Sequence, residues 1–305
     1  MFATARLLTI LLAAGVGQAL AQDRGTLDDK PLPPLENPNS PKLAARELFA
    51  RKPTPFPGPP RSIGFYSEGC LAGAAVLPLD GPAWQVMRPS RNRNWGNPKL
   101  IAFLERLATK SKPFWNGLLV GDLSQPRGGP MLTGHASHQI GLDADIWFKP
   151  TPDHVQSREE REFTSAINMV ADNRRDVDPN VWTHERTELV RAAAEDPVVE
   201  RIFVNAAIKK AMCREAGREK DWLAKVRPWW GHDYHFHIRI LCPADSPECK
   251  PQPPPESGDG CGHELDYWFS DAVLHPVPPL VPEKPKPALT LANLPSACRA
   301  LALSP

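Results

Sequence analysis

The chain has 305 residues, and its 36 Lys and Arg residues nearly balance its 35 Asp and Glu residues, leaving a formal net charge of +1. This balance excludes the strongly basic surface that proteins use to bind phosphate backbones, so we expect no nucleic-acid partner. Proline is abundant, with 36 residues concentrated toward the two ends. The central part has a length suited to one domain.

The chain begins with the pattern of a cleaved signal peptide. Arg6 precedes an apolar run from Leu7 to Val16, and Ala19-Leu-Ala21 is an A-x-A cleavage site. The alternative is an uncleaved anchor, but the run is too short for a hydrocarbon core of about 30 Å. We therefore expect residues 1–21 to be removed, no membrane span, and a mature protein exported to the periplasm.

Proline-rich segments flank the predicted domain. Residues 22–61 form a lead-in without apolar periodicity, and residues 271–305 have a similar composition. The C-terminal segment is either a spacer or, as we favour, a strap held on the domain by Cys298. The domain itself is expected to span residues 62–270.

Helical and strand patterns alternate irregularly within residues 62–270. Helices are predicted after Asn97, from the Ser157–Glu160 capping box through Phe163, Ile167 and Val170, over Arg186–Glu195, and from Asn205 to Ala216. Strands are predicted within Trp115–Leu123 and Val198–Val204. This order predicts an α+β fold, a single domain with a central antiparallel sheet and helices around it.

Two further segments alternate as half-buried strands. In the first, Leu142, Ala144, Ile146 and Phe148 share one face, and Asp143, Asp145 and Trp147 share the other. In the second, Tyr234, Phe236, Ile238 and Ile240 lie opposite His235, His237 and Arg239. His138 precedes Asp145 by seven residues, so a loop through Gly141 can fold its imidazole over the strand.

These polar faces predict a metal site. His138, Asp145 and His237 would be three protein ligands that leave a fourth position for water, the arrangement of catalytic zinc. Cysteines, which closed structural sites usually use, are absent from both clusters. Asp143 is expected to orient a ligand rather than bind the metal.

Other residues near this site have two possible roles each. His235 is our general base, with a supporting role for a ligand as the alternative. His232 would stabilise charge on the reacting carbonyl or cap its loop. His135 lines the cleft or contributes to a second metal.

Trp229 and Trp230 could form the floor of a substrate groove, although core packing is the more common fate of paired tryptophans. His154, His184, His263 and His275 are expected at the surface.

The combination of His-x6-Asp with a later His-x-His resembles the zinc signature of the lysostaphin/D-Ala-D-Ala metallopeptidase group. The flanking GHASHQ, GLD and RPWW strings are similar to those of its penicillin-insensitive murein endopeptidase family, over roughly residues 62 to 270. Residues 22–61 depart from that family by being longer and richer in proline. The resemblance implies a Zn²⁺ cofactor and, as substrate, the D-alanyl to meso-diaminopimelyl cross-link of peptidoglycan.

Two other functions compete with this one. The same zinc ligands would serve a D,D-carboxypeptidase, in which case the length of the groove decides. An inactive zinc-bearing binding or regulatory protein would be expected to lack a base such as His235. The absence of a Ser-x-x-Lys nucleophile in a matching context argues against an acyl-enzyme and against sensitivity to penicillin. The sequence leaves the oligomeric state open.

Six cysteines fit an oxidising compartment and allow three disulfides in 15 connectivities. Cys242 and Cys249 flank a short loop and could close it locally. The family resemblance implies the pairs Cys70–Cys298, Cys213–Cys261 and Cys242–Cys249.

Overall fold

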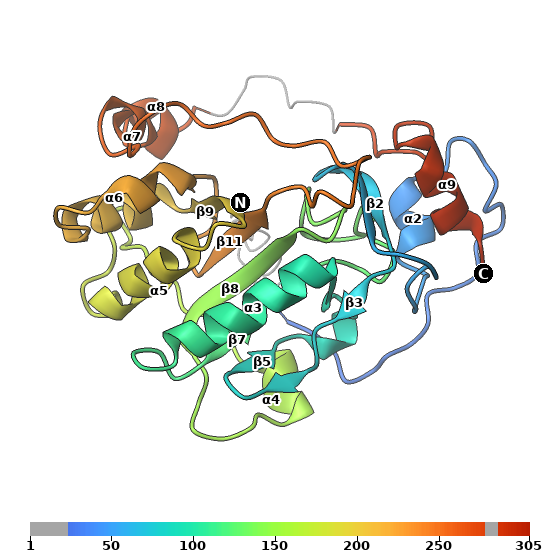
Figure 1. The fold of residues 1–305 in the computed structure, drawn as a ribbon, viewed down its shortest axis with the longest axis horizontal. Coiled ribbons are helices and arrows are strands. Elements are labelled where there is room, and N and C mark those ends of the chain that lie inside the picture. The colour runs from blue at the N-terminus through green and yellow to red at the C-terminus, as the bar shows by residue number, and fades with distance from the viewer. Residues whose placement is uncertain (1–23, 278–285) are drawn as a thin grey trace, which may run out of the picture.

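A seven-stranded sheet organises the computed structural model, which describes residues 24–277 and 286–305 (Figure 1). The expected signal peptide, residues 1–21, lies outside the described residues. In spatial order the strands are β10 (Val226–Pro228), β9 (Val199–Val204), β11 (His235–Ile240), β8 (Asp143–Pro150), β7 (Leu118–Val120), β5 (Trp84–Val86) and β4 (Asp80–Gly81). Two small sheets pair β1 (Arg61–Phe65) with β2 (Glu68–Ala72), and β3 (Ala75–Val76) with β6 (Trp95–Gly96).

The main sheet is mixed rather than wholly antiparallel. Its centre follows the prediction, because β8 pairs antiparallel with both β7 and β11, and β11 pairs antiparallel with β9. Toward the edges, β10 pairs parallel with β9, and β5 pairs parallel with β7. The chain connects both parallel pairs through helices, α6 between β9 and β10 and α3 between β5 and β7, the usual way to join parallel strands.

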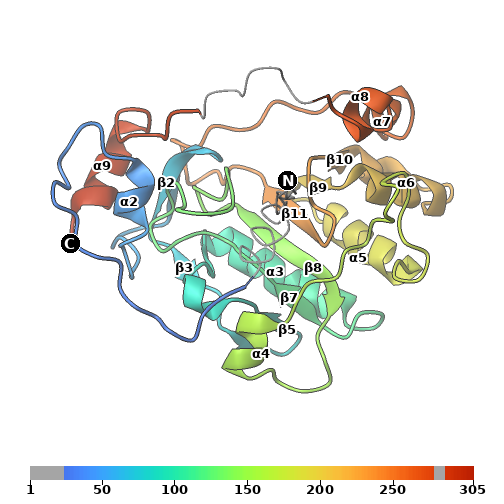
Figure 2. The ribbon, with the colours of Figure 1, turned by 180° about the vertical axis from the view of Figure 1, so that it is seen from behind.

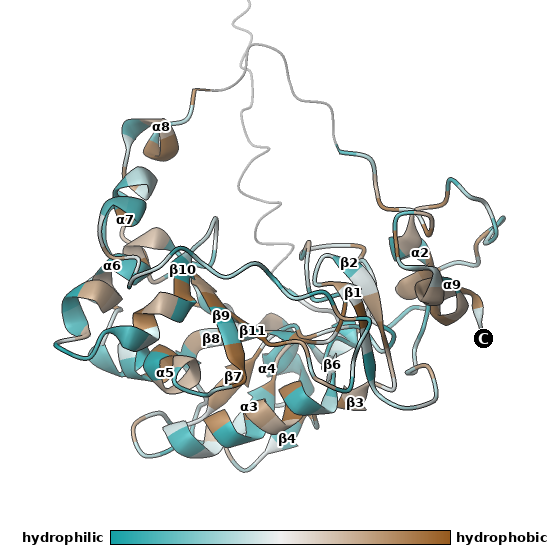
Figure 3. Cartoon of the chain, turned by 45° about the horizontal axis from the view of Figure 1, so that its top comes forward, coloured by the Kyte–Doolittle hydropathy of each residue, from teal (hydrophilic) through white to brown (hydrophobic). Residues whose placement is uncertain are grey.

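The longer helices cover one face of this sheet (Figures 1 and 2). They are α3 (Pro98–Ser111), α5 (His184–Ala194) and α6 (Ala206–Glu215). Asn97 and Asn205 cap α3 and α6 by accepting backbone N–H groups of Lys99 and Ala207 at 3.0 Å. The apolar sides of these helices and of the central strands form one hydrophobic core. Figure 3 shows hydrophobic and hydrophilic segments side by side on these helices, as their amphipathic sequences require.

The helix opened by the capping box is shorter than predicted. The box itself is present, but α4 covers only Arg158–Phe163, so placing Ile167 and Val170 on this helix was wrong. The physical reason lies in Arg88, whose guanidinium donates to the carbonyls of Arg161 and Thr164 at 2.5 and 2.7 Å. These bonds satisfy carbonyls at the end of the helix, and the backbone turns extended at Thr164.

A second hydrophobic cluster joins segments from the two proline-rich regions to β1 and β2. It is built around α2 (Ala45–Phe49) and α9 (Ser296–Leu303), which lie together on one side of the molecule (Figure 1). The Cys70–Cys298 disulfide links β2 to α9, so the C-terminal segment is covalently attached beside the main sheet. Among the described residues the remaining helices are the short α7 (His263–Trp268) and α8 (Asp271–Leu274), and two 3₁₀ turns cover Pro89–Arg91 and Asp221–Lys225.

Cys213–Cys261 and Cys242–Cys249 complete the disulfides, and the three pairs are those that the resemblance implies. None of the helices in the described ranges is both long enough and apolar enough to cross a bilayer.

Candidate metal centre

Strands β8 and β11 place the predicted polar residues on one face of the sheet. Their antiparallel register sets Asp145 opposite His237 and Asp143 opposite Arg239. On the reverse face, Ile146, Phe236 and Ile238 are buried in the core. The predicted alternation of both segments is therefore confirmed, and it brings histidines and carboxylates from distant parts of the chain together.

His138 reaches this face from the loop before β8. Its backbone has a positive φ of 68°, and its N–H donates to Asp143 Oδ2 at 3.0 Å. Gly141 turns the same loop at φ 70°, where an added Cβ would lie 2.5 Å from a methyl group of Leu71 and 2.9 Å from the Asn97 nitrogen. Glycine is therefore required at the turn that carries His138 back over the strand.

One carboxylate oxygen forms the centre of the cluster. Asp145 Oδ1 lies 3.1 Å from His237 Nδ1, 3.5 Å from His138 Nε2 and 3.6 Å from His235 Nε2. The other oxygen, Oδ2, lies 3.5 Å from His135 Nδ1. Ligand atoms of His135, His138 and Asp145 all fall within 4.8 Å of one another, so among the described residues these three form a group that could hold a metal ion.

Buried polar atoms in this cluster lack hydrogen bonds. Asp145 Oδ1 and both ring nitrogens of His138 are buried without a hydrogen-bond partner, as is His235 Nδ1. Such groups are rare in folded proteins and cost about 1–3 kcal/mol each. A cation among them would satisfy the carboxylate oxygen and one nitrogen of each ligating imidazole. The donor set therefore fits a metal, and His with Asp is a set that zinc commonly takes.

Asp143 holds the cluster from behind. It is fully buried and accepts two N–H groups of Arg239, at 2.8 Å on Oδ1 and 3.0 Å on Oδ2. The same carboxylate accepts the backbone N–H of His138 and lies 3.3 Å from His237 Nε2. This leaves Nδ1 of His237 directed at Asp145, the geometry expected of a residue that orients a ligand.

A second carboxylate supports His135 from the opposite side. Asp122 Oδ2 lies 3.0 Å from His135 Nε2 and pairs with Arg91 and Arg93 at 3.1 and 2.8 Å. The sequence patterns assigned no role to Asp122. No pattern in the sequence marks it, because Asp122 meets His135 only through the pairing of β7 with β8.

His232 and His235 line the same face. His235 is buried, and its ring centroid lies 4.9 Å from that of His232. His232 Nδ1 lies 2.8 Å from the Trp230 carbonyl, so Nδ1 carries the donated proton and Nε2 remains available to the cleft. The backbone of His232 has a φ of 52°, an unfavourable conformation that non-glycine residues adopt more often at functional sites.

The histidines of the cluster differ in the direction of their pKa shifts. Burial lowers the pKa of His235 to about 4 and that of His232 to about 3, with repulsion from neighbouring imidazoles adding to the effect. Burial also opposes charge on His237, but Asp143 and Asp145 outweigh it and raise its pKa to about 9. For Asp145, burial is outweighed by the surrounding histidines, which hold the pKa of this carboxyl well below its usual range.

A cleft of about 360 Å³ opens onto His232, His237 and Arg239. Its wall includes Trp229 and also Phe203, which the sequence analysis missed. Trp229 and Trp230 are 53% and 51% exposed, so the expectation that they pack in a core was wrong. Strand β10 ends at Pro228, and Trp229 follows it at the surface. The backbone N–H of Trp229 donates to the Val204 carbonyl. The four histidines predicted at the surface are exposed: His154, His184, His263 and His275.

Comparison with known proteins defines the class to which this fold and site belong. A sequence profile described as penicillin-insensitive murein endopeptidase matches residues 62–303. The chain is 47% identical over 249 residues to the penicillin-insensitive murein endopeptidase of Pectobacterium atrosepticum, covering 81% of this chain and 85% of that protein. It is 44% identical over 251 residues to the protein of the same name from Yersinia enterocolitica, covering 81% and 87%.

The corresponding protein of Haemophilus influenzae is 45% identical over 232 residues, covering 73% of this chain and 77% of that protein. The chain therefore belongs to the penicillin-insensitive murein endopeptidase family, a family of peptidases.

Proposed function

We propose that this protein is an exported zinc endopeptidase that hydrolyses the D-alanyl to meso-diaminopimelyl cross-link of peptidoglycan in the periplasm. The observation that carries the proposal is the convergence of three imidazole nitrogens within 3.6 Å of the buried, unbonded Asp145 Oδ1. Family membership supports the peptidase chemistry and the peptidoglycan substrate.

His138, Asp145 and His237 would hold the zinc, which when bound polarises a carbonyl and activates water at neutral pH. His135 adjoins Asp145 on the side held by Asp122 and is the candidate for a fourth contact or for a second metal ion. Three protein ligands would leave a fourth position for water, as in catalytic zinc sites. If His135 bound the same ion as His138, Asp145 and His237, it would take the position that water needs.

The chain's own groups then divide the remaining work. His235, whose Nε2 faces Asp145, would take a proton from the attacking water and return it to the leaving amine. His232 would be neutral with its one proton on Nδ1, donated to the Trp230 carbonyl, so its Nε2 would accept an N–H group of the substrate rather than donate to the carbonyl. Arg239 and Asp143 would position His237 and the His138 backbone without touching the substrate.

Digestion of purified sacculi tests this function. The protein should convert cross-linked dimeric muropeptides to monomers, lose this activity with a chelator and regain it with zinc. Benzylpenicillin should neither acylate the protein nor slow it, because the proposed route has no serine nucleophile. Release of terminal D-Ala alone would establish a D,D-carboxypeptidase instead. Full activity of protein shown by elemental analysis to be metal-free would overturn the mechanism.

A further inference from the structure

Exposed aromatic side chains gather beside the cleft. Trp229, Trp230 and Tyr267 are 53%, 51% and 60% exposed. Trp268 lies with its ring centroid 5.0 Å from Trp230 and 5.8 Å from Tyr267. We call these four residues the aromatic platform. Large exposed aromatic patches on a protein usually mark a binding surface, since isolated exposed residues are the norm elsewhere.

The platform begins at the proposed active site. Trp229 lines the cleft with His232 and His237, and its ring lies 5.9 Å from that of Phe203. Phe203 in turn packs 5.4 Å from the His237 ring. The next residue, Trp230, contacts Trp268 of α7 at a ring-centroid distance of 5.0 Å, so the chain leads from the cleft at Trp229 to α7.

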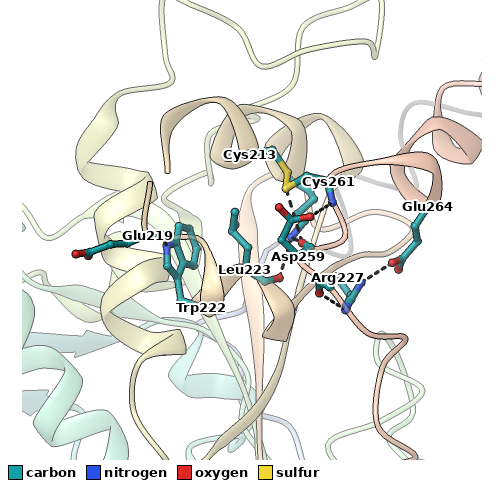
Figure 4. Close-up of a disulfide and its surroundings, with 10 residues drawn as sticks. Cys213, Glu219, Trp222, Leu223, Arg227, Asp259, Cys261 and Glu264 are labelled. Atoms are coloured by element: carbon teal, nitrogen blue, oxygen red, sulfur yellow. Dashed lines mark hydrogen bonds and ion pairs between the residues drawn. A yellow bond between two sulfur atoms is a disulfide. The ribbon is translucent and has the colours of Figure 1, made fainter. Parts of the chain in front are cut away.

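A rigid support holds α7 in place (Figure 4). The Cys213–Cys261 disulfide ties the start of α7 to α6, and Arg227 of β10 forms an ion pair with Glu264 on α7. Arg227 also donates to the carbonyls of Glu256 and Gly258 at 2.7 and 3.1 Å. These contacts hold the backbone that carries Tyr267 and Trp268 before any ligand arrives, so binding would require little ordering of α7.

The outer end of the platform adjoins a polar hollow. Tyr267 and Trp268 line it together with the glycine-rich loop before α7, and its charged lining residues include Glu256, Asp259 and Glu264 but no Lys or Arg. Carboxylates and backbone carbonyls accept hydrogen bonds from hydroxyl and amide groups.

We propose that the aromatic platform and this hollow bind the glycan strand of peptidoglycan, an uncharged polymer of N-acetylated amino sugars. A pyranose ring presents an apolar C–H face that packs on aromatic rings, and a rim of hydroxyl and amide donors that carboxylates accept. The inference rests on the proposed function, because the glycan is covalently attached to the stem peptides whose cross-link would occupy the cleft. In this proposal α7 contacts the glycan, so it would favour intact peptidoglycan over a peptide without sugars.

Substrates with and without sugar test the proposal. Tyr267→Ala and Trp268→Ala should lower kcat/KM about tenfold on sacculi, the worth of one well-packed aromatic contact. On a cross-linked peptide dimer stripped of sugars, both variants should stay within about twofold of wild type, because neither residue lines the cleft. Phe114→Ala, which removes a 38% exposed ring at the far end of α3, is the matched control. Equal losses on both substrates would overturn the proposal.

Binding without hydrolysis separates this inference from the proposed function. Chitin oligosaccharides titrated into chelated, inactive protein should change tryptophan fluorescence in wild type and Phe114→Ala. The affinity should fall about tenfold in Tyr267→Ala. Absence of any binding by the wild type would overturn the inference, even if cross-links are cut. Binding by a protein that cuts no cross-link would leave the glycan site standing and overturn the endopeptidase function. If Tyr267→Ala instead abolishes self-association and leaves sugar binding unchanged, the platform is an interface between copies.

Discussion

The two faces of the β8–β11 pair are equally buried and chemically opposite. On one face, Phe236 and Ile238 are inaccessible to solvent and pack against apolar neighbours. On the other, Asp145 and His237 are each 4% exposed, yet Asp145 Oδ1 has no hydrogen bond. Burial alone therefore does not reveal the site. What distinguishes it is that several buried polar atoms without partners, on His138, Asp145, His235 and His237, lie together at one place.

The two faces contribute to the free energy of folding with opposite signs. Burying a large apolar side chain stabilises the fold by about 1.5–3 kcal/mol. Burying an unpaired polar atom costs about 1–3 kcal/mol. The apolar face thus stabilises the sheet by itself, whereas the polar face is stabilised only when a ligand that binds the native state compensates it.

The largest effect is expected from His237→Ala. Two remaining ligands hold zinc poorly, so the variant should lose both bound metal and activity, by more than about 10⁴-fold in turnover. Elemental analysis and muropeptide release on the same preparation check this. His275→Ala, on an exposed histidine, should retain both. Retention of zinc and rate by His237→Ala would show that His237 is not a ligand and would leave His135, His138 and Asp145 as the metal-binding group.

His235→Ala should separate metal binding from proton transfer. The variant should keep about one zinc per chain, because His138, Asp145 and His237 remain. Its turnover should fall roughly 10²–10⁴-fold, the usual contribution of a positioned acid–base group. The same two measurements decide the outcome. Loss of zinc by His235→Ala, together with zinc retained in His237→Ala, would exchange the two assignments.

Phe236→Ala tests the apolar face of the same strand. The free energy of unfolding should fall by about 3–5 kcal/mol, because truncation of a buried Phe leaves a cavity in the core. Zinc stoichiometry in the folded fraction should not change. Denaturant titration of the chelated protein measures the loss, with Phe163→Ala on the partly exposed α4 as control. A loss below about 1 kcal/mol would mean that this face is not tightly packed.

Among the variants of the polar face, Asp143→Asn should show the smallest fold-change, and the change should fall on metal binding. It keeps the shape that supports His237 but removes the charge that Arg239 and His237 face, so zinc affinity should fall about 10- to 100-fold. Competition with a chelator of known affinity measures the dissociation constant. Asp122→Asn is the parallel variant behind His135. An equal loss in that variant would make His135 a ligand of the same ion, and no loss in Asp143→Asn would contradict its positioning role.

Much of the site follows from local sequence patterns. The alternation in residues 142–148 and 234–240 correctly predicted which side chains share a face, because strand periodicity is a local property. Asn97 and Asn205 likewise marked the starts of α3 and α6 through capping chemistry that involves neighbouring residues only. The ligand assignments drawn from these patterns stay predictions that the metal measurements will test.

Other features depended on contacts between distant segments. Arg88 ends α4 through carbonyls more than 70 residues away. Asp122 becomes a partner of His135 because β7 pairs with β8. The two parallel pairs, β9–β10 and β5–β7, arise from the positions of α6 and α3 between their strands. Trp229 is exposed because β10 is an edge strand.

By itself, the sequence determined the alternating faces, the capped helices and the histidine and aspartate spacing, since each depends on residues a few positions apart. The tertiary structure decided that Asp143 is locked by Arg239, that Asp122 supports His135, and that α7 meets Trp230 beside the cleft. These contacts join residues that are 13 to 96 positions apart. Their formation depends on the register of β8 with β11, the pairing of β7 with β8 and the Cys213–Cys261 disulfide, none of which has a local signature.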